Sequence, residues 1–296
     1  MRRRIIRQGN NSFTITLPIR WIRNNNITGN EEISVEEEEN QLKISTEKKQ
    51  EKKEITLELS ENNSRSVRFV MQQAYRQNYD KIIVKYSSEQ IYETLIEVID
   101  NYFVGLEIVE KHKNTCIISV IVETNEEKFK IFLRKMFFLI KDSLTLLASK
   151  DIKSIHYNYL KLYAFQNYGK RYIYSKKAEL SSYDYYSLLS YLLNIHSDID
   201  KFASSLKNKN KLNSKMNKII EIFESIERNF YLKKADILMK ITENLQKMIE
   251  ETQNKKNLSR DDFLVLHYQI EITRLLYGAL SPLLGIILYE SHKASL

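Results

Sequence analysis

Apolar and hydroxyl side chains alternate strictly over residues 12–17, so that Phe13, Ile15 and Leu17 share one face. This period of two predicts a half-buried strand. Pro18 ends the strand and suits the first turn of a short helix, which the next apolar residues continue. Shorter apolar alternations predict three further strands, which begin near Ile5, Ile33 and Leu42.

The pattern over residues 55–123 switches repeatedly between the strand period and the helix period. The predicted order, strand, helix, strand, helix, strand, strand, is typical of a small α/β module. Asn78 is expected to end the first of these helices in the left-handed conformation. Residues 46–54 contain no apolar residue and predict a linker or an exposed extension of a strand.

From residue 126 onward the apolar positions follow helical spacing, for example at Leu133, Phe137 and Ile140. A segment rich in lysine and asparagine at 207–215 divides this region in two, which predicts a duplicated helical bundle over 126–206 and 214–292. Only two prolines and six glycines in the whole chain favour long helices.

The uncharged segment 275–289 is shorter than the roughly 20 residues that a membrane span needs. It also contains Gly278, Pro282 and Gly285. We therefore expect a buried core helix there and no membrane insertion. The N-terminus shows no secretory signal, and the one cysteine, Cys116, suits a reducing compartment, so a cytoplasmic location is expected.

Charge is distributed unevenly at the N-terminus. The chain of 296 residues has 46 Lys+Arg and 38 Asp+Glu, hence 46 − 38 = +8. The first 24 residues contain six arginines and no acid, whereas residues 31–39 contain six glutamates. This asymmetry indicates one face that meets a polyanion, although a solvated tail would have the same composition.

A unit of about 45 residues rarely stabilises itself without disulfides, metal or oligomerisation. This one contains no cysteine and no cluster of metal-ligating residues. Dimerisation is therefore predicted, with the apolar faces of two copies forming one shared core.

The run RRIIRQGNNSFTITLPIRW at 3–21, followed by GNEEI at 29–33, resembles the AbrB/SpoVT-type swapped-hairpin DNA-binding domain. The resemblance implies that two chains interleave their hairpins into one β-barrel and that arginines on one face bind double-stranded DNA. Asn30 stands where the family usually has Asp. Arginine forms bidentate bonds with phosphates and guanine edges. The expected DNA-binding residues are Arg4, Arg7 and Arg20 first, with Arg2, Arg3 and Arg23 in support.

Residues 74–82 and 105–109 resemble the region that joins an AbrB-type head to a PhoU-type helical domain in archaeal phosphate-uptake-regulator-like proteins. The family usually has Gly where Asn78 stands. PhoU-type domains often carry a repeated acidic motif that binds metal, and its nearest counterparts here, at 194–198 and 271–278, are degraded. No metal and no cofactor is therefore predicted. Weak alternatives remain at His196, Asp198 and Asp200, and at His267 with Glu271.

Residues 157–191 contain ten tyrosines interleaved with basic residues, a composition that can stack on single-stranded nucleic acid. Packing between helices is the favoured interpretation. Walker, HExxH, GxSxG and GxGxxG motifs are absent, so no enzymatic activity is predicted.

These patterns together predict an α+β multidomain protein. The expected domains are a dimeric swapped-hairpin DNA-binding domain at 1–46, a small α/β module at 55–123 and an all-α PhoU-like bundle at 126–292. The hypothesis is a transcriptional regulator that works as a homodimer or a larger oligomer. Its targets would be the genes of phosphate uptake or of a related response, and its bundle would oligomerise or sense a signal. Two alternatives stay open: an architectural DNA-binding protein, and a signalling adaptor that binds a transporter or kinase through the bundle.

Overall fold

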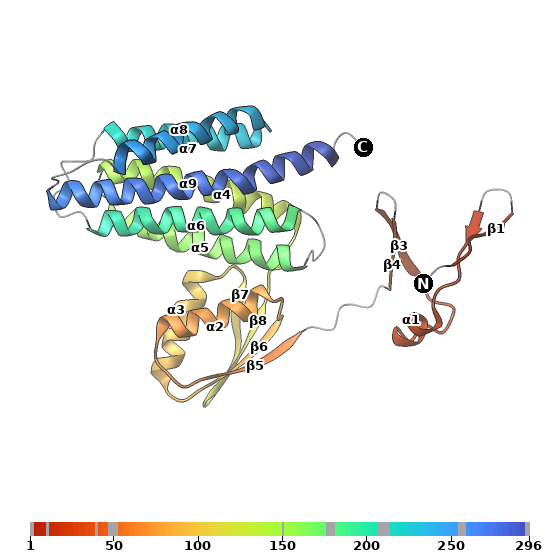
Figure 1. The fold of residues 1–296 in the computed structure, drawn as a ribbon. Coiled ribbons are helices and arrows are strands. Elements are labelled where there is room, and N and C mark those ends of the chain that lie inside the picture. The colour runs from red at the N-terminus through yellow and green to blue at the C-terminus, as the bar shows by residue number, and fades with distance from the viewer. Residues whose placement is uncertain are drawn as a thin grey trace. The chain divides into compact units, whose positions relative to one another are not determined.

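The structure is a computed structural model, and it describes residues 3–9, 12–38, 41–46, 53–149, 151–175, 181–205, 214–253 and 259–293. The chain divides into two compact units, residues 1–52 and 53–296, which we call the head and the body. Each unit is described by itself (Figure 1). Arg2, Asn40 and most of the segments 46–54 and 207–215 lie outside the described residues.

The described part of the head consists of two β-hairpins and one short helix. The strands β1 and β2 pair antiparallel with Ile6 opposite Thr14, and β3 pairs antiparallel with β4, with Ile33 opposite Thr46. The two hairpins form separate two-stranded sheets. The bounds are β1 Ile6–Gln8, β2 Ser12–Thr14, α1 Ile19–Asn24, β3 Ile33–Glu38 and β4 Gln41–Thr46.

The strand predicted over 12–17 is shorter in the structure, because β2 ends at Thr14. Its partner β1 begins at Ile6, the residue opposite Thr14, so the residue after Thr14 pairs with no strand among the described residues of the head. The apolar alternation continues beyond this pairing to Leu17. The apolar pattern therefore extends past the pairing that the described residues of one head supply.

The first part of the body is an α/β module in the predicted order of elements. Its sheet has the strand order β5-β6-β8-β7, in which β5 and β6 are parallel and the other pairs are antiparallel. The helices α2 and α3 contribute Val67, Met71 and Leu95 to its core. The bounds are β5 Glu54–Leu59, α2 Ser64–Arg76, β6 Lys81–Tyr86, α3 Glu89–Tyr102, β7 Leu106–His112 and β8 Thr115–Val120.

Two turns of the module use the left-handed region of backbone space. Asn78, just after α2, has φ 61°, which confirms the conformation predicted for it. Asparagine tolerates this region better than most residues because its short side chain bonds locally. Gly105, between α3 and β7, has φ 67°, and a Cβ there would lie 2.4 Å from Val122 Cβ.

Replacing Gly105 with alanine is expected to lower the free energy of unfolding of the body by about 2–4 kcal/mol, from backbone strain combined with overpacking. Urea unfolding followed by circular dichroism measures the change. Glu107→Ala, at an exposed position of the adjacent strand, is the control and should leave the midpoint unchanged. Equal midpoints for Gly105→Ala and wild type would contradict the close approach to Val122.

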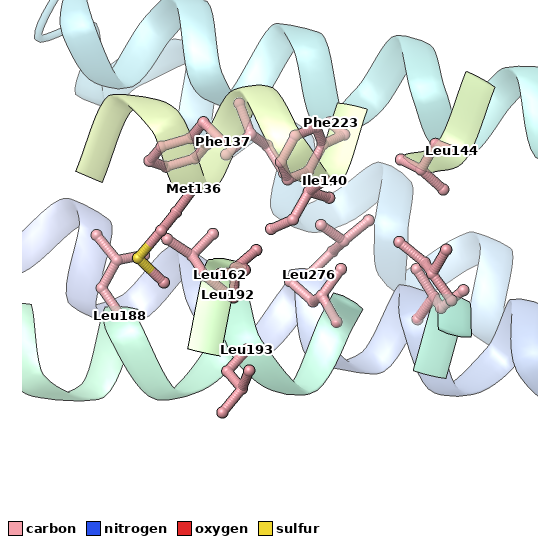
Figure 2. Close-up of a cluster of buried hydrophobic side chains, with 14 of the residues drawn as sticks. Met136, Phe137, Ile140, Leu144, Leu162, Leu188, Leu192, Leu193, Phe223 and Leu276 are labelled. Carbon is pink, nitrogen blue, oxygen red and sulfur yellow. The ribbon is translucent and has the colours of Figure 1, made fainter. Parts of the chain in front are cut away.

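The second part of the body is a bundle built from six described helices. They share one continuous core, in which Met136, Ile140, Leu162, Leu192 and Leu276 converge from four helices (Figure 2). The buried residues of α4 follow the predicted helical spacing. The bounds are α4 Glu126–Ser149, α5 Ile152–Ser175, α6 Ser181–Ser205, α7 Ser214–Tyr231, α8 Ala235–Gln253 and α9 Arg260–Lys293.

Three helices of the bundle, α4 to α6, precede the 207–215 segment, and the other three, α7 to α9, begin at Ser214 or later. The two sets are not separate lobes, because α9 packs along α6 and α4 packs against α7 within the common core (Figure 1). The duplication and the PhoU-like character of the bundle stay predictions, as do the domain boundaries.

The helix α9 contains the segment that resembles a membrane span. By length and composition Asp262–His292 is able to cross a membrane, and half of its most apolar window is buried inside the body. Ile272, Leu283 and Ile286 of this helix belong to the bundle core. This burial agrees with the core helix that the sequence predicts.

The module and the bundle have separate cores but meet along α2, α3 and α5. Arg171 of α5 donates through Nη1 to the carbonyls of Tyr75 and Tyr79, at 2.7 and 3.0 Å, and through Nη2 to Asp80 Oδ1 at 2.6 Å. Asn167 donates through Nδ2 to the carbonyl of Tyr102 at 2.7 Å. Buried, hydrogen-bonded polar groups of this kind fix the orientation of the two parts.

Candidate nucleic-acid interface

Five of the six arginines predicted to bind DNA lie among the described residues, and all five side chains are exposed. They come from two places in the head. Arg3 and Arg4 precede β1 and Arg7 lies on it, whereas Arg20 and Arg23 lie on α1. The structure gives no nucleic acid, so the assignment of each arginine to DNA stays a prediction.

The short helix α1 owes its position to Pro18. The carbonyl of Pro18 accepts from the backbone N–H groups of Trp21 and Ile22 at 2.9 and 3.1 Å and so forms the first turn. Trp21 and Ile22 are half-buried, while Arg20 and Arg23 lie three residues apart and are exposed. Residues at this spacing share a helix face. The helix therefore presents two guanidinium groups side by side to solvent.

The arginines lie in a part of the head that contains no acid before Glu31. Glu31, Glu32 and Glu37 follow, and all three are exposed. Charges separated along a small domain in this way create a positive potential over one part of its surface. Most arginines at such a surface contact the phosphates and set the register, and a few contact base edges.

Glu31 has a second role that sequence analysis missed. Its carboxylate accepts from Thr28 Oγ1 at 2.7 Å, from Thr28 N at 2.9 and 3.0 Å, and from Gly29 N at 2.9 Å. The Thr28 hydroxyl and these backbone N–H groups lower the pKa of Glu31 to about 2. Glu31 thus closes the loop between α1 and β3, next to Asn30, where the AbrB resemblance places an aspartate.

The carboxyl of Glu31 is expected to titrate near pH 2 in the folded head, and Thr28→Val should raise its pKa toward 4.5. Because the folded pKa is the lower one, the loop contacts stabilise the head above the unfolded pKa of 4.5 and are lost as pH falls toward 2. A carbon-detected NMR titration of the side-chain carboxyl measures this.

Thr28→Ser, which keeps the hydroxyl, is the matched control and should keep the pKa low. A wild-type Glu31 that titrates at the ordinary value of a glutamate would contradict the loop geometry.

The head also exposes most of its large apolar side chains. Phe13 is 67% exposed, Leu42 64% and Val35 55%. No head residue whose exposure the structure gives is fully buried, and neither core cluster contains a residue of the head. The other exposed large apolar side chains of the head are Ile5, Ile6, Ile15 and Ile19.

The tyrosine-rich segment lies on α5 and α6. Tyr163 and Tyr168 are buried, with 7% and 0% of their surfaces exposed, which agrees with helix packing at these positions. Tyr183 and Tyr157, at 86% and 58%, face solvent. The rings therefore do not form one exposed stacking surface.

The residues of the weak metal alternatives have other partners. His196 bonds through Nε2 to Ser143 Oγ at 2.8 Å, and burial lowers the pKa of this histidine to about 4. Asp198 pairs with Lys201 at 2.9 Å. In the part of the chain that the structure describes, no three His, Cys, Asp or Glu side chains gather in a group that could hold a metal.

Both side chains of the Ser143–His196 pair are fully buried, so this contact is closed to a substrate.

His267 and Glu271, the second weak metal alternative, also contact different partners. His267 stacks on the ring of Phe263, with an interplanar angle of 8°. Glu271 forms an ion pair with Arg274 at 2.9 Å.

Comparison with known protein families gives a match at the N-terminus. The family model for the antidote-toxin recognition protein MazE, a bacterial antitoxin, matches residues 6–54. No curated protein and no solved structure matches the chain. The match supports an AbrB-like DNA-binding domain at the N-terminus, as the sequence predicts. It ends at 54, beyond the predicted boundary at 46, and does not cover the rest of the body.

Proposed function

We propose that this protein is a DNA-binding transcriptional regulator, with no enzymatic activity, that binds double-stranded DNA through the head. The observation that carries the proposal is the set of exposed arginines in the acid-free stretch of the head, three of which, Arg7, Arg20 and Arg23, lie in the family-matched residues. Arginine binds phosphate through two parallel N–H groups, which makes such a surface suited to the DNA backbone. The proposal places the protein in the cytoplasm.

The active form that we propose is a homodimer joined through the head. Seven large apolar side chains of a unit of about 50 residues are exposed in the single chain, Phe13 and Leu42 among them. So many exposed apolar side chains on so small a unit favour a second copy that covers them. The pairing left open beyond Thr14 is the place where a strand of the partner would extend the sheet.

The body would oligomerise the protein further or sense a signal. The most specific part of the proposal is a role in phosphate uptake. It is supported only by the resemblance of residues 74–82 and 105–109 to phosphate-uptake-regulator-like proteins.

Fluorescence anisotropy of a labelled duplex with the full chain, between about 50 and 300 mM salt, tests DNA binding. Log affinity should fall steeply with log salt, by roughly 0.9 for each phosphate that is neutralised. The absence of binding at about 50 mM salt would overturn the proposal and favour the adaptor. Genome-wide occupancy then separates a regulator, at a few promoters, from an architectural protein, which covers DNA broadly.

The family match favours one second candidate, an antitoxin-type regulator that also binds a protein toxin. The matched model describes antitoxins, and it covers the head of this chain. Co-expression with the product of the adjacent gene distinguishes the two. If the product of the adjacent gene arrests growth and this protein relieves the arrest by forming a stoichiometric complex with it, the antitoxin role is supported. If that product does not arrest growth and forms no complex with this protein, the two are not a toxin–antitoxin pair.

A further inference from the structure

The contact between the module and the bundle contains two cations, one buried and one half-buried, that form no ion pair with a carboxylate among the described residues. Arg76, the last residue of α2, and Lys170 of α5 both lie there, and Lys170 is only 6% exposed. Among the described residues neither of them forms an ion pair, whereas the neighbouring Arg171 pairs with Asp80. Burying a cation without a counter-ion is costly.

Hydrogen bonds bring the two cations together. Gln166 accepts through Oε1 from Arg76 Nη2 at 2.8 Å and donates through Nε2 to the carbonyl of Leu189 on α6 at 3.2 Å. Lys170 lies one turn after Gln166 on α5 and donates to Ser190 Oγ, also on α6, at 2.8 Å. Arg76 and Lys170 therefore lie at one junction of three helices, α2, α5 and α6.

The partners of both cations are neutral. Arg76 donates to two amide oxygens, Gln166 Oε1 and Asn167 Oδ1, each at 2.8 Å. Lys170 donates to one hydroxyl, and its ammonium lies 4.2 Å from the centre of the Tyr186 ring. These bonds leave several N–H groups of the guanidinium and the ammonium without an acceptor, since an arginine has five and a lysine has three.

The surroundings of Lys170 disfavour its charged form. Burial, and then the charge of Arg76, lower the pKa of Lys170 to about 7. Burial also lowers the pKa of Arg76. Beside the junction, Tyr186 is 44% exposed and Ser190 is only partly buried.

We propose that this junction, with Arg76 and Lys170 as its charged ligands and the Ser190 hydroxyl beside them, binds a small oxyanion of the phosphate or sulfate type. Two converging cations with free donors recognise such an anion by charge-assisted hydrogen bonds. Arg76 belongs to the module and Lys170 to the bundle, so the bound anion would join the two parts. This ligand site is independent of DNA binding by the head.

Thermal unfolding of the full chain tests the site, with inorganic phosphate or sulfate at low millimolar concentration against chloride at equal ionic strength. Wild type should gain a saturable increase in midpoint, as expected for a ligand that binds only the folded state. Lys170→Met and Arg76→Met should each weaken the apparent affinity at least about 10-fold. Lys161→Met, at an exposed position of the same helix, is the matched control and should respond like wild type.

Stability without added anion separates a ligand site from a structural role. Removing an uncompensated buried cation should leave Lys170→Met at least as stable as wild type in chloride. A large loss of stability in this variant would show that Lys170 is structural and would overturn the proposal. Equal stabilisation of wild type, Lys170→Met and Arg76→Met by sulfate would also overturn it, because it would show a general salt effect.

Discussion

Alanine at Arg4, Arg7 and Arg20 together should lower the affinity for a DNA duplex at least about 100-fold at about 100 mM salt. In a dimer the triple variant removes three guanidinium groups from each chain, hence six in all. At roughly 0.9 per phosphate, the slope of log affinity against log salt should become shallower by up to about 5.

The single variants show how much each of the three arginines contributes to the affinity and to its salt dependence. Each single variant should make the slope shallower by about 1 if the arginine of one copy contacts a phosphate. The change should be about 2 if the arginines of both copies do so. A variant that loses affinity for one sequence only, with its slope kept, marks an arginine that contacts a base edge. Fluorescence anisotropy across salt measures both quantities.

Arg65→Ala is the matched control, since this arginine is exposed but belongs to the body. It should leave the slope and the affinity unchanged. If the triple variant binds as wild type does, the acid-free stretch of the head does not contact DNA, and the solvated tail that the composition also allows becomes the better interpretation.

Local patterns predicted the elements well because each depends on residues close in sequence. The strand around Phe13, the helix that begins after Pro18 and the left-handed turn at Asn78 all follow from backbone and side-chain chemistry within a few residues. The buried stripe through Leu133 and Phe137 follows from the helical period in the same way.

The features that sequence analysis missed depend on contacts between distant residues. Arg171 and Lys170 are adjacent in sequence, yet one pairs with Asp80, 91 positions away, and the other has no acidic partner among the described residues. Only the packing of α2 and α6 on α5 creates this difference. The sequence of the stretch around them was interpreted by its tyrosines. The contacts that distinguish it in the structure are made by the two cations between the tyrosine rings.

Glu31 was missed for the opposite reason, because its partners are close but its role depends on loop conformation. The sequence shows Gly29-Asn30 followed by a run of glutamates, which indicates a turn and an acidic surface. The carboxylate instead folds back onto Thr28 and Gly29, where it satisfies backbone N–H groups. A glutamate two or three positions after a Thr-Gly pair is the signal that sequence analysis can use in other heads of this kind.

Phe13→Asp should prevent the head from dimerising and reduce DNA binding to the level of the triple arginine variant. Phe13 lies on the apolar face of β2 and is 67% exposed in the single chain, so a charge there costs little in a monomer. In a shared core it would bury an unpaired carboxylate, which is strongly destabilising. The same charge at Thr14, on the opposite face of the same strand, is the matched control and should leave dimerisation intact.

The single tryptophan of the chain, Trp21, lies in the head and reports on this unit alone. It is half-buried in the single chain, so a shared core should shift its emission to shorter wavelength as protein concentration rises. Wild type and Thr14→Asp should show this shift, and Phe13→Asp should keep a long-wavelength emission at every concentration. Because the signal comes from the head, association through the body does not mask it. A concentration-dependent shift and wild-type DNA affinity in Phe13→Asp would show that the exposed apolar face is not the dimer core.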